Sequence, residues 1–374
     1  MNYISIYPLS AIFYFLMLIT SVFLAYISVR SKNFTQSFFL AILVLFLSIV
    51  AGFRGESVGI DTRSYFYSID MIGLSDGFVQ ARASEFGHAL FIKLVYIFIS
   101  SPQAVIFLYA LITNFLIIKR LWSLRDKFSF SFSVFLYLCF YYILTYNTMR
   151  QWVAIAIVFY GMKYLFKAKY FSFSVLVLIA STIHTTALIS LSLIPIFITY
   201  FKRYSNKHKL AWWGILFSSP LIFGFFIIIL ENTSIFSQYD RYFRESFFSF
   251  SLLWFVNLAL IVFILIFIPY SDINFKRPLQ DKLVVNHYDF YILTKWICVV
   301  SVLIRTVGRF YPYTSRAALY FAIFEITLFS YGIKSRRFGL ILKLALIFLG
   351  LFNFYTIMSN SGYGQMPYIP FWQF

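Results

Sequence analysis

Arginines and tyrosines alternate along one short stretch late in the chain, between two apolar runs. A guanidinium group binds phosphate or carboxylate through two parallel hydrogen bonds, and an aromatic ring offers an apolar face to a sugar. Arginines at a membrane edge also extend toward lipid headgroups, but their concentration in one turn favours a site for a phosphate and a sugar. The residues are Arg305, Arg309, Tyr311, Tyr313, Arg316 and Tyr320.

A second polar stretch follows an early apolar run. Arg54 begins it, Gly59 and Asp61 follow, and Tyr65 lies near its end. Glycine lets the main chain approach a ligand closely, the arginine can bind an anion, and the aspartate can orient sugar hydroxyls or the arginine itself. A turn closed by a local pair between Arg54 and Asp61 has the same pattern, and the residue types leave both interpretations open.

Two further polar clusters lie where apolar runs begin. Glu85 precedes a short apolar stretch, where a carboxylate serves either as a general base or as a charge that stabilises a helix N-terminus. Asn147, Arg150 and Gln151 open another run, and such side chains face either lipid headgroups or a cavity. Both clusters are therefore candidate sites with a structural alternative.

His184 is the only histidine deep within an apolar stretch, and threonines surround it. An ionisable residue at membrane depth is costly and marks a functional site, although a lone histidine can also be a packing residue. No histidine, cysteine or acidic residue lies at helical spacing from His184, so we predict no metal site there. Cys139 and Cys298 lie inside apolar runs and are expected to be packing residues.

The elements that position these residues are predicted to be membrane helices. The chain has 374 residues, of which 61% are hydrophobic, 23% aromatic and 12% charged, with a mean hydropathy of +0.82. Lipid offers no partner to main-chain polar groups, so each apolar run must be helical. We predict an all-α polytopic bundle of about ten to thirteen transmembrane helices. Its spans lie at roughly 8–29, 35–53, 103–121, 128–146, 149–166, 211–230, 252–269, 288–306, 315–331 and 338–358.

Two apolar stretches fit a single span poorly. Residues 88–100 form a short stretch that contains Lys93, which predicts an interfacial or tilted helix after an outer loop at about 54–87. Residues 171–200 are too long for one span and are interrupted around His184, so we expect two short helices that meet there. One transmembrane domain, residues 1–374, accounts for the whole chain.

The net charge of +18 is divided by residue type. If the N-terminus lies outside, most lysines fall in cytoplasmic loops, as the positive-inside rule requires. The basic residues left outside are almost all arginine, so an anion site is expected to face outward. Contacts with membrane lipids explain most of the charge, and we predict no nucleic-acid partner. The outer basic residues are Arg54, Arg63, Arg82, Lys93, Arg150, Arg241, Arg244, Arg305, Arg309 and Arg316.

Several common enzyme motifs do not occur in this sequence. Without a P-loop, ATP is not implied, and without an Asp-x-Asp pair, a metal-dependent nucleotide-sugar transferase is not implied. No segment resembles a serine hydrolase elbow. We therefore predict neither a cofactor nor a metal.

The ordered set of polar motifs resembles the EpsG family, the Wzy-like polymerases of exopolysaccharide, capsule and O-antigen. The resemblance covers about residues 35 to 325, and the aromatic tail at 367–372 is also similar to that family's ending. The motifs are Arg54, Gly59-x-Asp61-Thr62-x-x-Tyr65, Glu85-x-Gly87, Asn147-x-x-Arg150-Gln151, His184 and Arg316-x-x-x-Tyr320-Phe321.

The resemblance implies a glycosyltransferase-C-like membrane fold and an inverting, metal-independent glycosyl transfer. Both sugar chains would be carried on undecaprenyl diphosphate at the outer face of the bacterial inner membrane. A chain-length regulator and a flippase are the expected protein partners. An O-antigen-ligase-like transferase is the closest alternative, followed by a flippase or transporter of the same lipid-linked sugars and by a structural subunit.

On this interpretation, the outward arginines neutralise the departing diphosphate and an acidic residue or histidine accepts the proton of the acceptor hydroxyl. We expect the base to be Glu85 or Asp61, with His184 third. The predicted diphosphate contacts are Arg54, Arg150, Arg309 and Arg316. The predicted sugar contacts are Tyr65, Asn147, Gln151, Tyr311, Tyr313 and Tyr320.

Overall fold

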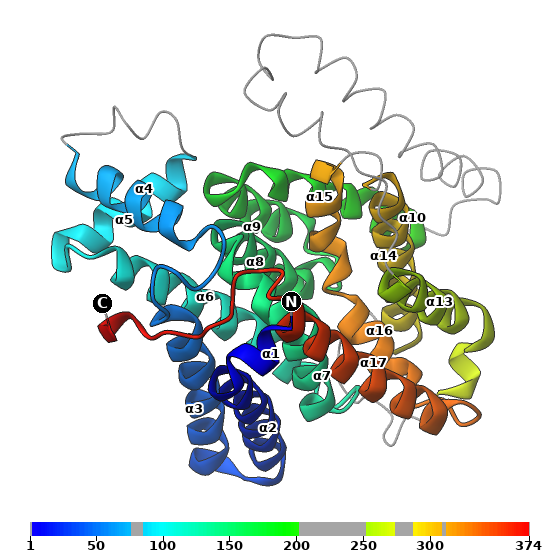
Figure 1. Ribbon diagram of the computed structural model, residues 1–374. Coiled ribbons are helices and arrows are strands. Elements are labelled where there is room, and N and C mark those ends of the chain that lie inside the picture. The colour runs from blue at the N-terminus through cyan, green and yellow to red at the C-terminus, as the bar shows by residue number, and fades with distance from the viewer. Residues whose placement is uncertain (1, 76–84, 202–251, 274–286, 309–311, 374) are drawn as a thin grey trace. The chain divides into compact units, whose positions relative to one another are not determined.

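The structure, a computed structural model, describes residues 2–75, 85–201, 252–273, 287–308 and 312–373 (Figure 1). The predicted span at 211–230 lies outside these residues. The described part is helical, apart from connecting segments and two isolated β-bridges, so the predicted all-α membrane fold is confirmed. Four described helices are long and apolar enough to cross a bilayer: α2 (Pro8–Arg30), α3 (Asn33–Gly52), α6 (Pro102–Trp122) and α17 (Gly339–Asn360).

The chain forms two compact units, which are described separately. The first comprises residues 1–160, 175–187 and 339–374, and the second comprises residues 161–174 and 188–338. Besides the four long helices, the first unit contains shorter ones. These include α1 (Tyr3–Ile6), α4 (Thr62–Leu74), α5 (Phe86–Phe98), α7 (Phe130–Tyr137) and most of α8 (Met149–Leu165) and α9 (Tyr170–Ile183).

Local sequence explains where several helices begin. Pro8 and Pro102 occupy the first turns of α2 and α6, where a missing N–H costs nothing because that group has no partner within the helix. The Ser129 side chain accepts a hydrogen bond from the Phe132 main-chain N–H and caps α7. The basic residues in the last turn of α6 complement the negative end of the helix dipole.

The predicted span at 128–146 is one helical run with three geometries. After α7 it widens to a π-helix at Leu138–Tyr142 and tightens to a 3₁₀-helix at Ile143–Tyr146. The Cys139 carbonyl accepts a hydrogen bond of 2.6 Å from the Asn353 side chain in α17, and the Tyr142 hydroxyl donates to the Leu47 carbonyl in α3 at 2.6 Å. Such polar contacts fix the register between apolar helices.

Two sequence predictions in the first unit meet different outcomes. The break at His184 is confirmed, because α9 ends at Ile183 and a 3₁₀-helix begins at Thr185. The sequence predicts an outer loop at about 54–87, but helix α4 (Thr62–Leu74) lies in the middle of this region. Helix α4 buries Ile69 and Ile72 in a hydrophobic core that α5 and α6 share, so tertiary packing stabilises a helix that hydropathy alone does not reveal.

The described part of the second unit contains helices and a buried ion pair. Its described elements include α10 (Leu193–Phe201), α13 (Leu252–Phe267), α14 (His287–Val307), α15 (Pro312–Ala322) and α16 (Glu325–Gly332). The predicted span at 315–331 is therefore divided between α15 and α16. Arg305, near the end of α14, donates to the Glu325 carboxylate at the start of α16, and the Ser301 hydroxyl donates to the same oxygen.

Replacing Arg305 by leucine is expected to destabilise the protein by about 3–5 kcal/mol, because Glu325 is only 1% exposed and would be left buried without its cation. Thermal and denaturant unfolding of purified protein in detergent measure the change. Arg337→Ala is the control, since Arg337 is 79% exposed and lies 3.9 Å from Asp272, and it should cost about 1 kcal/mol or less. Equal losses from the two variants would contradict the structural role of the buried pair.

Candidate active site

The Glu85 carboxylate is the centre of a polar cluster in the first unit. Its Oε2 accepts a hydrogen bond of 2.6 Å from Arg150, and its Oε1 lies 3.0 Å from His184 Nδ1. The Thr185 main-chain N–H also donates to Oε1, at 3.2 Å. The three charged or ionisable side chains are 20 to 29% exposed, so a ligand can reach them while most of their surface is shielded from water.

Each member of the cluster stands at a helix end. Glu85 precedes α5, Arg150 lies in the first turn of α8, and His184 occupies the break between α9 and the following 3₁₀-helix. Main-chain N–H groups at helix N-termini have no partner within the helix, which explains why Thr185 donates to Glu85. The sequence motifs around Glu85, Arg150 and His184 are therefore brought together at one place.

The cluster keeps Glu85 ionised. Burial raises the pKa of its carboxyl, but the hydrogen bond from His184 and the charge of Arg150 outweigh burial and lower that pKa to about 2. Because the pKa is depressed, the contribution of this carboxylate to stability is complete above its ordinary value of about 4.5 and is lost only as the pH falls through about 2. At neutral pH Glu85 is thus an acceptor of hydrogen bonds and a weak base.

Aromatic and histidine side chains surround this cluster. Tyr65, from α4, forms a hydrogen bond with Arg150, which places this predicted sugar contact beside the cluster. His88 Nδ1 lies 2.6 Å from the Tyr109 hydroxyl, and both side chains are buried. Thr185, His88 and Tyr109 were not predicted as site residues, and only contacts across the fold identify them.

Gly87 lets α5 approach α9 closely enough to form the cluster. A Cβ atom on Gly87 would lie 2.8 Å from the Thr182 Cβ and 2.9 Å from the Thr182 carbonyl carbon. Gly87 is two residues after Glu85, and Thr182 is two residues before His184. Only a residue without a side chain therefore allows the present spacing of Glu85 and His184.

The family resemblance implies polymer formation, and we expect Gly87→Ala to lower it by roughly tenfold or more, because a displacement of about 1 Å within such a site is costly. The measurement is the amount of polymer made per amount of membrane-inserted protein. Gly362→Ala is the matched control, since no atom lies within 4 Å of the added methyl group there. Equal activity of both variants would mean that the α5–α9 spacing is unimportant.

Arg54 has a structural environment. Its side chain is 1% exposed, and its guanidinium group donates to the carbonyls of Ala51, Val58 and Tyr146. Main-chain oxygens thus occupy the donors that a diphosphate would need. This burial argues against the predicted diphosphate contact of Arg54. The alternative local pair with Asp61 is not among its hydrogen bonds either.

The remaining predicted contacts of the first unit are mostly held by the protein. Asp61 is the N-cap residue of α4 but its side chain does not cap that helix. The Asn147 amide donates to the Tyr363 carbonyl at 3.0 Å, and Gln151 is 2% exposed. In this conformation Asn147 and Gln151 are therefore engaged within the protein and are not open to a sugar. The role of Asp61 as a base stays a prediction.

The arginine-rich turn belongs to the second unit and is described only in part. Arg309 and Tyr311 lie outside the described residues. Arg316 is exposed on α15, where it is accessible to an anion, and Tyr313 lies on the same helix. Tyr320 is 1% exposed, so its ring is a packing residue here rather than a platform for a sugar.

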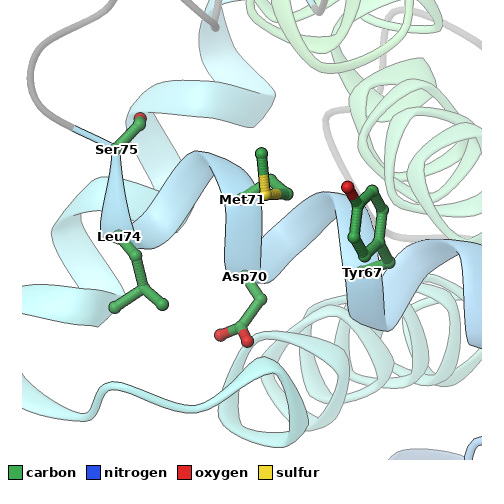
Figure 2. A pocket seen from close by; sticks show the side chains of 5 residues that line it. All are labelled: Tyr67, Asp70, Met71, Leu74 and Ser75. Atoms are coloured by element: carbon green, nitrogen blue, oxygen red, sulfur yellow. The ribbon is translucent and has the colours of Figure 1, made fainter.

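A pocket on α4 is lined by other side chains than those of the charged cluster. Its volume is about 280 Å³, and its lining includes Asp70, whose carboxylate accepts a hydrogen bond of 2.8 Å from Tyr96. Figure 2 shows the five lining side chains, four on α4 and Ser75 directly after it: Tyr67, Asp70, Met71, Leu74 and Ser75. None of its described lining residues is an arginine or histidine, so these residues do not supply the groups that a diphosphate-leaving reaction requires.

The described residues contain no group of three or more histidine, cysteine, aspartate or glutamate side chains that could hold a metal ion. A family model described as the EpsG family matches residues 37–371. The chain belongs to the EpsG family. Membership in the EpsG family broadly supports a function as a polysaccharide polymerase with glycosyltransferase-like activity, for a protein embedded in a membrane. Searches of curated proteins and of solved structures found no match.

Proposed function

We propose that this protein joins undecaprenyl-diphosphate-linked oligosaccharide repeat units into a surface polysaccharide. The observation that supports this proposal most strongly is the convergence of Glu85, Arg150 and His184 in one partly exposed cluster. The cluster combines a cation for a phosphate with an imidazole for a proton. These are the two groups that a metal-independent glycosyl transfer from a lipid diphosphate requires.

The proposed reaction exchanges one glycosidic bond for another. An acceptor hydroxyl on the new repeat unit attacks the anomeric carbon of the growing chain, and the bond between that carbon and the diphosphate oxygen breaks. The bonding electrons leave with the diphosphate, and the hydroxyl proton passes to a base. Attack opposite the leaving group inverts the anomeric configuration.

His184 is the base that the geometry favours, ahead of Glu85. The ionised Glu85 carboxylate accepts a hydrogen bond from His184 Nδ1, which leaves Nε2 to accept the proton of the acceptor hydroxyl in the proposed reaction. A carboxylate that orients an imidazole in this way also stabilises the imidazolium that forms. Glu85 therefore acts as the positioning residue.

Arg150 is proposed to stabilise the leaving diphosphate. One of its nitrogens donates to Glu85, and its side chain remains 29% exposed, so a ligand can reach part of this side chain. Its partner carboxylate holds the group in place before substrate binds, which reduces the cost of reorganisation. Exposed Arg316, on α15, is a second proposed contact, and Arg309 stays a third prediction.

The segregation of lysine and arginine supports a site on the outer face of the bacterial inner membrane. Lipid-linked repeat units reach that face after a flippase has moved them, and a chain-length regulator is the other proposed partner. Whether the product is O-antigen, capsule or exopolysaccharide depends on the sugars of the repeat unit. The charged groups of this site do not select among sugars.

Reconstitution of the purified protein with lipid-linked repeat units tests the proposal. A ladder of products that differ by one repeat unit, still attached to the lipid diphosphate, is the expected result. Movement of the repeat unit across the vesicle membrane without a ladder would indicate a transporter. Transfer of a finished chain to a different acceptor would indicate a ligase, and either outcome would overturn the proposed polymerase.

A further inference from the structure

The C-terminal segment, residues 361–371, lies along the loop that follows α3 (Figure 1, red segment). The Gly55 N–H donates to the Ile369 carbonyl at 2.7 Å, and the Phe371 N–H donates to the Phe53 carbonyl at 3.0 Å. Arg54 also forms an isolated antiparallel bridge with Pro370. Main-chain hydrogen bonds thus join the two segments over several residues.

A second part of the C-terminal segment contacts the end of the same loop. The Gly59 N–H donates to the Gly364 carbonyl at 2.8 Å, and the Ile60 N–H donates to the Tyr363 carbonyl at 3.2 Å. The Tyr363 carbonyl also accepts the hydrogen bond from Asn147. This one carbonyl therefore connects the loop with the residues that immediately precede α8.

Gly364 is required by this close approach. Its φ of +68° is in the left-handed region, and a Cβ atom there would lie 2.9 Å from the Ile60 nitrogen and 3.1 Å from the Gly59 carbonyl carbon. The obstructing atoms belong to the main chain and cannot rotate away, so any larger residue must displace the loop. Gly362, by contrast, has no atom within 4 Å of such a methyl group.

Arg54 transmits the position of the loop to α8. From its place between Phe53 and Gly55 it donates to the Tyr146 carbonyl at 2.8 Å and lies 3.2 Å from the Met149 sulfur. Met149 is the first residue of α8, and Arg150 follows it. The C-terminal segment, the loop and Arg54 therefore form a continuous series of contacts that ends next to Arg150.

We infer that the C-terminal segment is a positioning element of the active site, which holds the start of α8 so that Arg150 meets Glu85. This inference rests on the proposed function, because it concerns the same site. It also gives Arg54 a role: the residue positions Arg150 and does not touch substrate. The C-terminal segment itself lies outside the cluster and contributes no reacting group.

Gly364→Ala and the matched control Gly362→Ala test the inference. In the reconstituted assay Gly364→Ala should lower the rate of ladder formation per folded protein by about tenfold or more, while Gly362→Ala keeps the wild-type rate. Combination with Arg150→Lys decides the mechanism. If the segment acts through Arg150, Gly364→Ala should lower the rate by less than about threefold in the Arg150→Lys background, because effects within one coupled network are not additive.

An equal loss in both backgrounds would overturn the inference, since a general loss of stability lowers both rates by the same factor. Hydrogen exchange supplies a readout that does not need activity. Residues 146–151 should exchange faster in Gly364→Ala than in Gly362→Ala, and equal protection would also overturn it. A wild-type protein that makes no ladder would count against the proposed function, while altered exchange would still support the positioning role.

Gln365→Ala is the milder variant if Gly364→Ala does not accumulate in the membrane. Gln365 is fully buried, accepts a hydrogen bond from the Tyr363 N–H at 3.2 Å and donates to the Ile357 carbonyl. Its loss loosens the segment without a steric clash. It should therefore raise exchange at residues 146–151 and lower the rate in the same direction, and wild-type values for both would contradict the inference.

Discussion

Replacement of Arg150 by alanine is expected to lower polymer formation by roughly 10²- to 10³-fold, the usual effect of removing one donor that stabilises developing negative charge. In the proposed reaction, Arg150 stabilises the diphosphate, whose negative charge rises as its bond to the sugar breaks. Arg150 is held by Glu85 at 2.6 Å and is therefore already oriented before the substrate arrives. The measurement is the rate of ladder formation by purified protein.

The control for this prediction is Arg63→Ala. Arg63 is also predicted to face outward, but its side chain is 77% exposed and it lies 3.6 Å from Glu56, as expected of an ordinary surface charge. Its replacement should leave the rate within about twofold of wild type. A similar loss from both variants would show that total positive charge, and not the cluster, determines activity.

Replacement of His184 by alanine is expected to lower the rate by about 10²- to 10⁴-fold, which is the typical contribution of general base catalysis. The structure places this side chain in a helix break, with Nδ1 3.0 Å from Glu85 Oε1. The loss should appear in kcat more than in KM, because the base acts on the proton only as the new bond forms.

Ser181→Ala serves as the control for His184. Ser181 is near the end of α9, three residues before His184, and its hydroxyl donates to the Leu178 carbonyl within that helix, so its removal should not alter the site. If His184→Ala retained the wild-type kcat, another group would have to accept the proton. Asp61, whose role as a base stays a prediction, would then become the first residue to examine.

Much of this fold can be predicted from the sequence, because in a membrane a long apolar run indicates a helix and a polar interruption indicates a break in it. The break at His184 could be predicted, since a run of threonines and a histidine at membrane depth is tolerated only beside a cavity or other protein. Helix α4 could not be predicted from hydropathy, because it is stabilised through the burial of Ile69 and Ile72 by α5 and α6.

The site was less accessible to sequence reasoning than the fold. Residue types identified Glu85, Arg150 and His184 separately, but spacing does not reveal that a carboxylate and an imidazole 99 positions apart lie at 3.0 Å. Residue type is also misleading at Arg54. An arginine suggests a contact with an anion, but its hydrogen bonds to main-chain carbonyls and its 1% exposure indicate a structural role. Contacts across the fold, and not residue type, distinguish the structural Arg54 from the proposed site residue Arg150.

A single-turnover experiment tests the central claim, that glycosyl transfer occurs at the cluster of Glu85, Arg150 and His184. Purified protein is saturated with lipid-linked repeat units, and the joined product and the released undecaprenyl diphosphate are measured together. We expect the wild type to form the two products in equal amounts. His184→Ala should bind the substrate with unchanged affinity but form each product at no more than about a hundredth of the wild-type rate. Product formation at the wild-type rate by both His184→Ala and Arg150→Ala would contradict the claim.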